Sequence, residues 1–140
     1  KIQLFVESLV NSFWNGGRLF YVGSGTSGRL GVLDASECPP TYCTDPEMVQ
    51  GIIAGGDKAL KHSVEGAEDS QKDGANSIIQ KKVNKSDVVL GISANGDAPF
   101  IHGALAEAKT MGAVTGLLLC NSPMEKSYIE GAETNDCCFE

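Results

Sequence analysis

The sequence predicts an α/β fold, a three-layer αβα sandwich built around a mainly parallel sheet of five strands. Short apolar runs rich in β-branched residues alternate along the chain with helical segments, several of ten or more residues. This alternation is typical of right-handed β-α-β units, in which helices cover both faces of a parallel sheet. A length of 140 residues suits one domain, and 41% hydrophobic residues suit an ordinary globular core. We therefore expect a single domain over residues 1–140.

The spacing of apolar residues divides the chain into alternating elements. Apolar residues three and four positions apart indicate helices, and short continuous apolar runs indicate buried strands. Gly16-Gly17, Pro39-Pro40 and Gly55-Gly56 should separate the first elements, because glycine and proline interrupt regular structure. Asp97 should cap a later helix that opens with Pro99. The expected order is helix 2–13, strand 18–22, helix 27–36, strand 49–54, helical stretch 57–64, helix 70–83, strand 88–93, helix 97–111 and strand 114–120, followed by one helix and a short fifth strand.

The charge balance is acidic and argues against nucleic acid and anionic membranes as partners. Eighteen Asp and Glu residues outweigh eleven Lys and Arg residues, which gives a net charge of −7. An anionic ligand must therefore be attracted by local backbone donors. No apolar run approaches the ~18 residues of a membrane span, and the first residues lack the pattern of a signal peptide. We expect a cytoplasmic protein.

Cysteine usage points away from disulfides and zinc. The five cysteines are odd in number, and they contain no C-x-x-C pair. A disulfide framework and a zinc site are therefore disfavoured, and buried reduced thiols are the expected state. The cysteines are Cys38, Cys43, Cys120, Cys137 and Cys138.

A glycine-rich turn after the first strand is the strongest candidate for a ligand site. Residues 23–28 read GSGTSG, in which the glycines let a ligand approach the main chain and the other residues supply hydroxyl groups. If a helix starts near Ser27, its free N–H groups and its dipole favour a phosphate or carboxylate there. The candidate phosphate-binding residues are Ser24, Gly25, Thr26 and Ser27.

A second candidate turn follows the expected strand 88–93. The carboxyl ends of parallel strands meet at one edge of a sheet, and ligands bind where the strand order reverses. We therefore expect residues 94–97 to lie beside the glycine-rich turn. Ser93, Asn95 and Gly96 are the candidate ligand residues there.

Two other interpretations of the glycine-rich turn remain open. The pattern G-x-G-x-x-G also occurs in dinucleotide-binding folds, which place an acidic residue about 20 residues later at the end of the second strand. Here the second strand ends before Gly55-Gly56, and Asp57 comes too late for that spacing. Nicotinamide binding is therefore disfavoured. A glycine turn with a purely structural role is the other alternative.

Three segments carry a resemblance to a known family. They read GSGTSGRLGVLDASECPPT from residue 23, MVQGIIAGGDKAL from residue 48 and HSVEGAEDS from residue 62. From about residue 18 to residue 120, the chain resembles the sugar isomerase (SIS) domain of the N-acetylmuramic acid 6-phosphate etherase family. The resemblance implies a flavodoxin-like strand order and a homodimeric, cytoplasmic, metal-free enzyme of peptidoglycan amino-sugar recycling, with its site near the subunit interface. The implied reaction cleaves the lactyl ether of N-acetylmuramic acid 6-phosphate to N-acetylglucosamine 6-phosphate and D-lactate.

Two glutamates stand where the catalytic carboxylates of that family fall. By resemblance, Glu37 would be the acid that protonates the departing lactate, and Glu68 would be the base at carbon 2. From the residues alone, both could instead be solvated side chains. Arg29 could steer an anion or be solvated. His62 and His102 lie in expected helices without a matching nucleophile or metal ligand, so we interpret them as surface or packing residues.

The second turn departs from the family. Etherases have Ala-Ser-Gly-Arg-Thr-Pro-Tyr where this chain has ANGDAPF from residue 94, so two hydroxyls and one cation are missing. The carboxylate of Asp97 would oppose a phosphate held there. The triplet APF, with Ser93, resembles the corresponding loop of the glucokinase regulatory protein, a non-catalytic relative that binds fructose phosphates. A regulator or sensor that binds a sugar phosphate without turnover is therefore the alternative function. We also expect residues 1–140 to lack the C-terminal helical region that etherases carry.

Overall fold

One parallel sheet forms the centre of the molecule, in agreement with the sequence prediction. The computed structural model describes residues 2–120 and 137–139. Its five strands are all parallel and lie in the order β2-β1-β3-β4-β5, which is the flavodoxin-like order. They are β1 (Leu19–Gly23), β2 (Val49–Ile53), β3 (Val88–Ser93), β4 (Val114–Leu119) and β5 (Cys137–Phe139). The short fifth strand is therefore confirmed, whereas the helix expected just before it lies outside the described residues.

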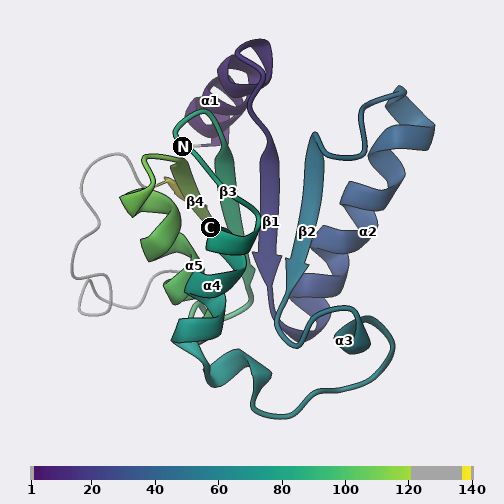
Figure 1. The fold of residues 1–140 in the computed structure, drawn as a ribbon, viewed down its shortest axis with the longest axis vertical. Coiled ribbons are helices and arrows are strands. Elements are labelled where there is room, and N and C mark those ends of the chain that lie inside the picture. Colours follow the sequence, from purple (N-terminus) through teal and green to yellow (C-terminus); the bar gives the residue numbers. More distant parts are fainter. Residues whose placement is uncertain (1, 121–136, 140) are drawn as a thin grey trace.

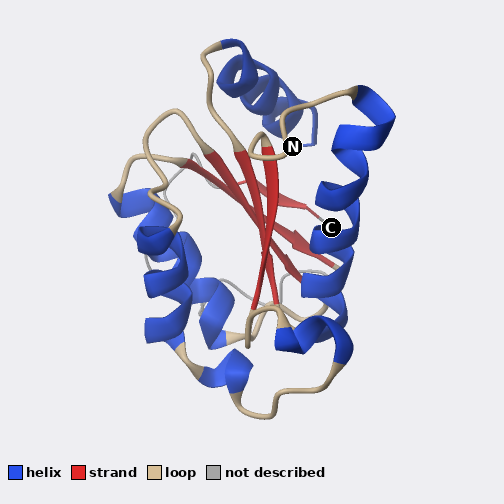
Figure 2. Ribbon diagram, turned by 45° about the vertical axis from the view of Figure 1, so that its right-hand side comes forward, coloured by secondary structure: helices blue, strands red, loops and turns tan. Residues whose placement is uncertain are grey.

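Helices cover the two faces of this sheet (Figures 1 and 2). They are α1 (Ile2–Trp14), α2 (Gly25–Tyr42), α3 (Lys58–Lys61), the 3-10 helix η1 (Ala67–Asp69), α4 (Gln71–Gln80) and α5 (Pro99–Thr110). On one face, α2 packs against β1 and β2, and Phe5 of α1 joins the same core. On the other face, α4 and α5 bury Ile78 and Ile101 against the strands. The three layers expected from the sequence are present.

Helix α2 is longer than the sequence predicts at both ends. It begins at Gly25 rather than near Ser27, and it runs through Pro39 and Pro40 to Tyr42. The prolines lie within the last turn and remove two N–H donors there, and the packing of α2 against β1 and β2 keeps the helix continuous past them. Its end is closed by Cys43, whose N–H donates to the carbonyl oxygen of Pro39 at 2.9 Å and whose backbone is left-handed.

Helices α3, α4 and α5, which follow β2 along the chain, are shorter than the sequence predicts. The stretch 57–64 contains only the four residues of α3, because His62 is already extended. Helix α4 ends at Gln80, and Lys82 turns the chain with a positive φ of 52°. The N-cap of α5 is Ala98 and not Asp97, since the Ala98 carbonyl accepts the first helical hydrogen bonds, from the N–H groups of Ile101 and His102.

An ion pair with a buried carboxylate ties together the amino ends of β1 and β3. Asp87 is 1% exposed, and its carboxylate lies 2.7 Å from Nη2 of Arg18. The same carboxylate accepts hydrogen bonds from the backbone N–H of Arg18 and from Asn84. The hydrogen bond to Asp87 raises the pKa of Arg18. The Arg18 guanidinium also stacks on Phe20, 4.8 Å from the ring centre.

Candidate functional site

The two ligand loops predicted from the sequence lie side by side at the carboxyl edge of the sheet. Strands β1 and β3 are neighbours, with Gly23 in register with Ile92. The chain leaves β1 into α2 and leaves β3 into the loop 94–98. Strand β2 pairs with the opposite side of β1, so this edge is the point where the strand order reverses.

The first turn of α2 forms the first part of the site. Ser24 is the N-cap residue, and the N–H of Gly28 donates to its carbonyl oxygen at 3.2 Å as the first helical bond. The N–H groups of the three residues between them therefore belong to the part of a helix that has no intrahelical acceptor. Together with the helix dipole and the nearby hydroxyls, these donors are suited to an anion.

Glycine allows this first turn to pack directly on the sheet. A Cβ atom added to Gly28 would lie 2.6 Å from the side chain of Ile53 and 2.8 Å from the carbonyl oxygen of Gly23. Gly25 has a positive φ of 51°, which favours glycine. The glycine spacing that we identified in the sequence thus follows from a close helix–strand contact and a left-handed backbone position.

The structure brings Glu68 to this turn. Glu68 lies in η1, and its Oε2 accepts a hydrogen bond of 2.9 Å from the hydroxyl of Ser24, 44 residues away in sequence. Gly66 precedes η1 with a φ of 72° and reverses the chain there. A carboxylate is therefore held within hydrogen-bond distance of the turn that is suited to an anion.

Glu37 is not brought to the same place within one chain. It lies on the exposed side of α2, twelve residues after Gly25. At 1.5 Å per residue, this is a separation of about 18 Å along the helix axis. Nearby, the hydroxyl of Tyr21 donates to Asp34 at 2.8 Å, and burial followed by this hydrogen bond raises the pKa of Tyr21. This bond connects β1 to the helix that carries Glu37.

The loop 94–98 forms the second part of the site. The N–H of Gly96 donates to the hydroxyl oxygen of Ser93 at 2.9 Å, and Gly96 has a φ of 86°. Nε2 of His102 lies 2.6 Å from the carbonyl oxygen of Gly96. Asn95 and Asp97 are exposed on either side of this glycine. Sequence reasoning missed His102, although a histidine six residues after a loop glycine, at the start of a helix, could have suggested the contact.

Other residues considered in the sequence have structural partners or lie apart from the loops. Nε of Arg29 donates to the carbonyl oxygen of Leu60 at 3.1 Å and so fastens α2 to α3. Cys38 is half-buried, and burial raises the pKa of its thiol. Cys43 and Cys120 are exposed, so the expectation of buried thiols is wrong for these two.

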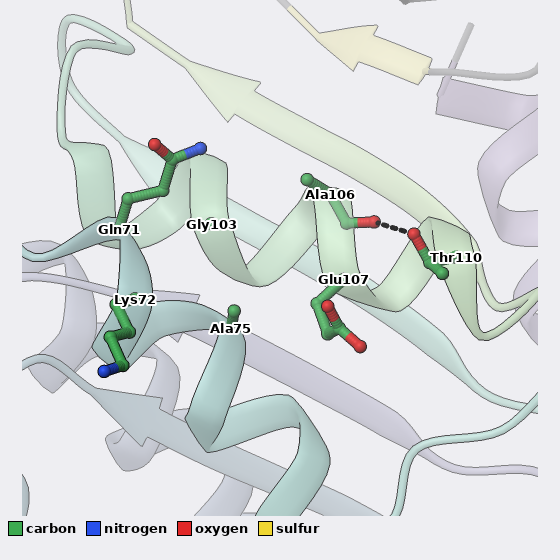
Figure 3. Close-up of a pocket in the computed structure, with 7 residues that line it drawn as sticks. All are labelled: Gln71, Lys72, Ala75, Gly103, Ala106, Glu107 and Thr110. Carbon is green, nitrogen blue, oxygen red and sulfur yellow. Dashed lines mark hydrogen bonds between the residues drawn. The ribbon is translucent and has the colours of Figure 1, made fainter.

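A shallow groove of about 500 Å³ runs between α4 and α5 (Figure 3). It is lined by residues of these two helices, of which Gly103 is buried and the others are exposed or half-buried: Gln71, Lys72, Ala75, Gly103, Ala106, Glu107 and Thr110. The helices are close here because Gly103 faces the backbone of Gln71. The groove contains none of the residues of the two ligand loops, and we do not include it in the candidate site.

The described residues show neither a membrane-spanning helix nor a metal-binding cluster. Within 2–120 and 137–139, none of the helices has both the length and the apolar character needed to span a bilayer. The same residues contain no group of three or more His, Cys, Asp or Glu side chains placed to hold a metal ion.

Comparison with known proteins places these features in a family. Residues 1–109 match the family model described as the glucokinase regulatory protein N-terminal SIS domain. The chain is 58% identical over 125 residues to an N-acetylmuramic acid 6-phosphate etherase of Gloeothece citriformis, covering 89% of this chain and 40% of that protein. A protein of the same name from Gloeobacter violaceus is 65% identical over 105 residues, covering 75% of this chain and 34% of the relative. The chain thus spans about two fifths or less of the length of these relatives.

A solved structure shares the fold. The phosphoheptose isomerase of Neisseria gonorrhoeae superimposes with a TM-score of 0.62 at 13% sequence identity, covering 94% of this chain and 67% of that one. At this identity the likeness concerns the fold alone. The match over residues 1–109 shows that the chain belongs to the glucokinase regulatory protein N-terminal SIS domain family.

Proposed function

We propose that this chain is the SIS part of an N-acetylmuramic acid 6-phosphate etherase, which releases D-lactate and N-acetylglucosamine 6-phosphate. The observation that carries the proposal is the hydrogen bond between Ser24 and Glu68, because it holds a carboxylate beside an anion-binding helix terminus. The high identity to relatives of that name supports the same reaction. In this proposal the chain acts in amino-sugar recycling in the cytoplasm.

The proposed chemistry is an elimination followed by hydration. Glu68 removes the proton at carbon 2 of the open-chain sugar, the carbon–oxygen bond to lactate breaks, and an acid protonates the departing oxygen. Water then adds to the unsaturated aldehyde and restores a hydroxyl at carbon 3. In this scheme the first turn of α2 binds the phosphate, with Gly25, Thr26 and Ser27 as donors. The hydroxyl of Ser24 orients the Glu68 carboxylate.

The position of Glu37 has a consequence for subunit organisation. An acid and a base that act on neighbouring carbons must both lie within hydrogen-bond reach of the same small group of atoms. The separation of about 18 Å between Glu37 and the start of α2 is too large for this within one chain. We therefore propose that Glu37 of one subunit protonates the leaving group in the site of a second copy.

The exposed side of α2 supports such a dimer. Leu30 is 55% exposed and Leu33 is 57% exposed. Both lie on the same side of the helix as Glu37, at spacings of seven and four residues. Burying this pair against a second copy would remove apolar surface from water and would carry Glu37 into the interface.

A binding-only function is the second candidate. The family model that matches residues 1–109 is described for the glucokinase regulatory protein. In the loop 94–98, the exposed carboxylate of Asp97 adds negative charge where a phosphate would approach. A protein that recognises a sugar phosphate without cleaving it would retain the first turn of α2 and lack turnover.

Complementation between inactive variants tests the proposal. The protein is incubated with N-acetylmuramic acid 6-phosphate in heavy water, and NMR follows lactate and deuterium at carbon 2. Glu37→Gln and Glu68→Gln should each abolish lactate release. If the two glutamates come from different subunits, mixing and reassociating the variants should restore about a quarter of the wild-type activity, because half of the dimers have one intact site of two.

The other outcomes discriminate between the candidates. Lactate release by the wild type with no recovery in the mixture would contradict the shared site. No lactate and no deuterium exchange, with thermal stabilisation by N-acetylglucosamine 6-phosphate, would favour the binding-only function. Deuterium exchange without lactate would support Glu68 as a working base and would point to failure of the step assigned to Glu37.

A further inference from the structure

We propose that His102 is a positioning residue that fixes the peptide after Gly96, so that the second ligand loop offers an N–H group to an anion. This inference rests on the proposed role of the loop 94–98 in binding a sugar phosphate. His102 is the fourth residue of α5 and is half-buried, with its ring directed back to the loop that precedes the helix.

The hydrogen bonds around Gly96 hold this residue from both sides. Its N–H donates to the Ser93 hydroxyl at 2.9 Å, and its carbonyl oxygen lies 2.6 Å from Nε2 of His102. A carbonyl oxygen can only accept, so Nε2 of His102 carries the hydrogen. The base of the same loop is held by the N–H of Cys120, which donates to the Ala94 carbonyl at 3.1 Å.

The direction of the Gly96 carbonyl determines the direction of the next N–H. The peptide bond between Gly96 and Asp97 is trans, so its C=O and N–H point to opposite sides of the backbone. Because His102 binds the C=O, the N–H of Asp97 points away from the imidazole. Within residues 2–120 this N–H has no hydrogen-bond partner, and a ligand oxygen could accept from it.

The hydrogen bond from His102 matters because Gly96 allows the peptide group between Gly96 and Asp97 to flip. Gly96 has a φ of 86° and no Cβ, and other backbone conformations are open to it at small cost. If the peptide turned over, the loop would present a carbonyl oxygen in place of an N–H group, and that oxygen would repel a phosphate. A hydrogen bond from His102 therefore selects the orientation that suits an anion, which partly offsets the charge of Asp97.

Two substitutions that carry the same amide group on side chains of different length test this inference. His102→Gln keeps an N–H donor at nearly the position of Nε2, whereas the amide of His102→Asn is too short to reach the Gly96 carbonyl. The ligand is N-acetylglucosamine 6-phosphate, and its dissociation constant is measured by calorimetry alongside the thermal unfolding temperature. We expect His102→Asn to weaken binding about threefold to tenfold, the range of one hydrogen bond, and His102→Gln to stay within twofold of the wild type. His62→Asn, at the other histidine, which is exposed at the end of α3, is the matched control and should bind as the wild type does.

An NMR measurement separates this inference from the proposed function. In His102→Asn, the amide signals of Gly96 and Asp97 should broaden or double as the peptide turns over, while His102→Gln should retain single sharp signals. If the wild type binds no sugar phosphate, the proposed function fails and these signals still test His102. Equal affinity and equal loop signals in the Asn and Gln variants would overturn the positioning role, as would equal losses in both.

Discussion

Replacing Asp87 by asparagine should remove a large part of the stability of this domain. The Asp87 carboxylate is 1% exposed and accepts five hydrogen bonds, two at Oδ1 and three at Oδ2, from Arg18 and Asn84. An asparagine amide has one oxygen only, so in either orientation at least two of these donors would face an NH₂ group. The variant also leaves the Arg18 guanidinium without its buried counter-charge. Breaking a fully buried pair typically costs about 3–5 kcal/mol, against a total of about 5–15 kcal/mol for an ordinary domain. The Arg18 side chain is 25% exposed, so water solvates part of the charge left behind, and we expect a loss in the lower half of that range.

Urea unfolding followed by circular dichroism measures this loss. With a slope of about 2 kcal/mol per molar urea, Asp87→Asn should lower the midpoint by roughly 2 M and leave the slope unchanged. Asp57→Asn is the matched control, since Asp57 is exposed and makes no side-chain cap bond to α3, and it should change the free energy of unfolding by less than about 0.5 kcal/mol. A loss below 1 kcal/mol in Asp87→Asn would refute the view that this buried pair holds β1 and β3 together.

Three further substitutions test other parts of the fold. Cys43→Gly should raise the free energy of unfolding by about 0.5 kcal/mol in urea, because Cys43 has a left-handed backbone (φ 55°) that strains other residues more than glycine. Gly74→Ala should lower the thermal unfolding temperature, at a cost of about 1–3 kcal/mol, because the new methyl group would collide with the carbonyl oxygen of Phe100 and force α4 away from α5. The raised pKa of Tyr21 means that its neutral form is favoured in the folded state and contributes to the free energy of unfolding. This contribution is complete below about pH 10 and is lost as the pH rises further. Tyr21→Phe, which also removes the bond to Asp34, should make the urea midpoint less sensitive to pH between 9 and 11; an equally steep fall would contradict this assignment.

The sequence was most informative where local pattern and tertiary context agree. Strand β3 spans the predicted residues, β2 and β4 end one residue earlier than predicted, and β1 is shifted by one residue. Buried parallel strands are continuous apolar runs, so their positions are visible in the sequence. Helix ends were less accurate, as α2 shows, because tertiary packing of this helix along two strands overrides the tendency of Pro39 and Pro40 to end it.

The sequence also indicated candidate residues for a ligand site, but it could not indicate how far apart they lie. Glu37 and Glu68 were paired by resemblance alone. The structure holds Glu68 at Ser24 and leaves Glu37 far along α2. The distance between Glu37 and the start of α2 follows from helix geometry once α2 is known to be one continuous helix.

The sequence by itself determined the order of strands and helices along the chain, the acidic charge and the glycine-rich turn. These features depend on composition and on short-range spacing. Only the tertiary structure decided the contacts between segments distant in sequence, which are Arg18 with Asp87 and Ser24 with Glu68. It also decided the contact of His102 with the carbonyl of Gly96. Such contacts depend on the direction in which each backbone segment leaves the sheet edge, and single-residue preferences do not encode that direction.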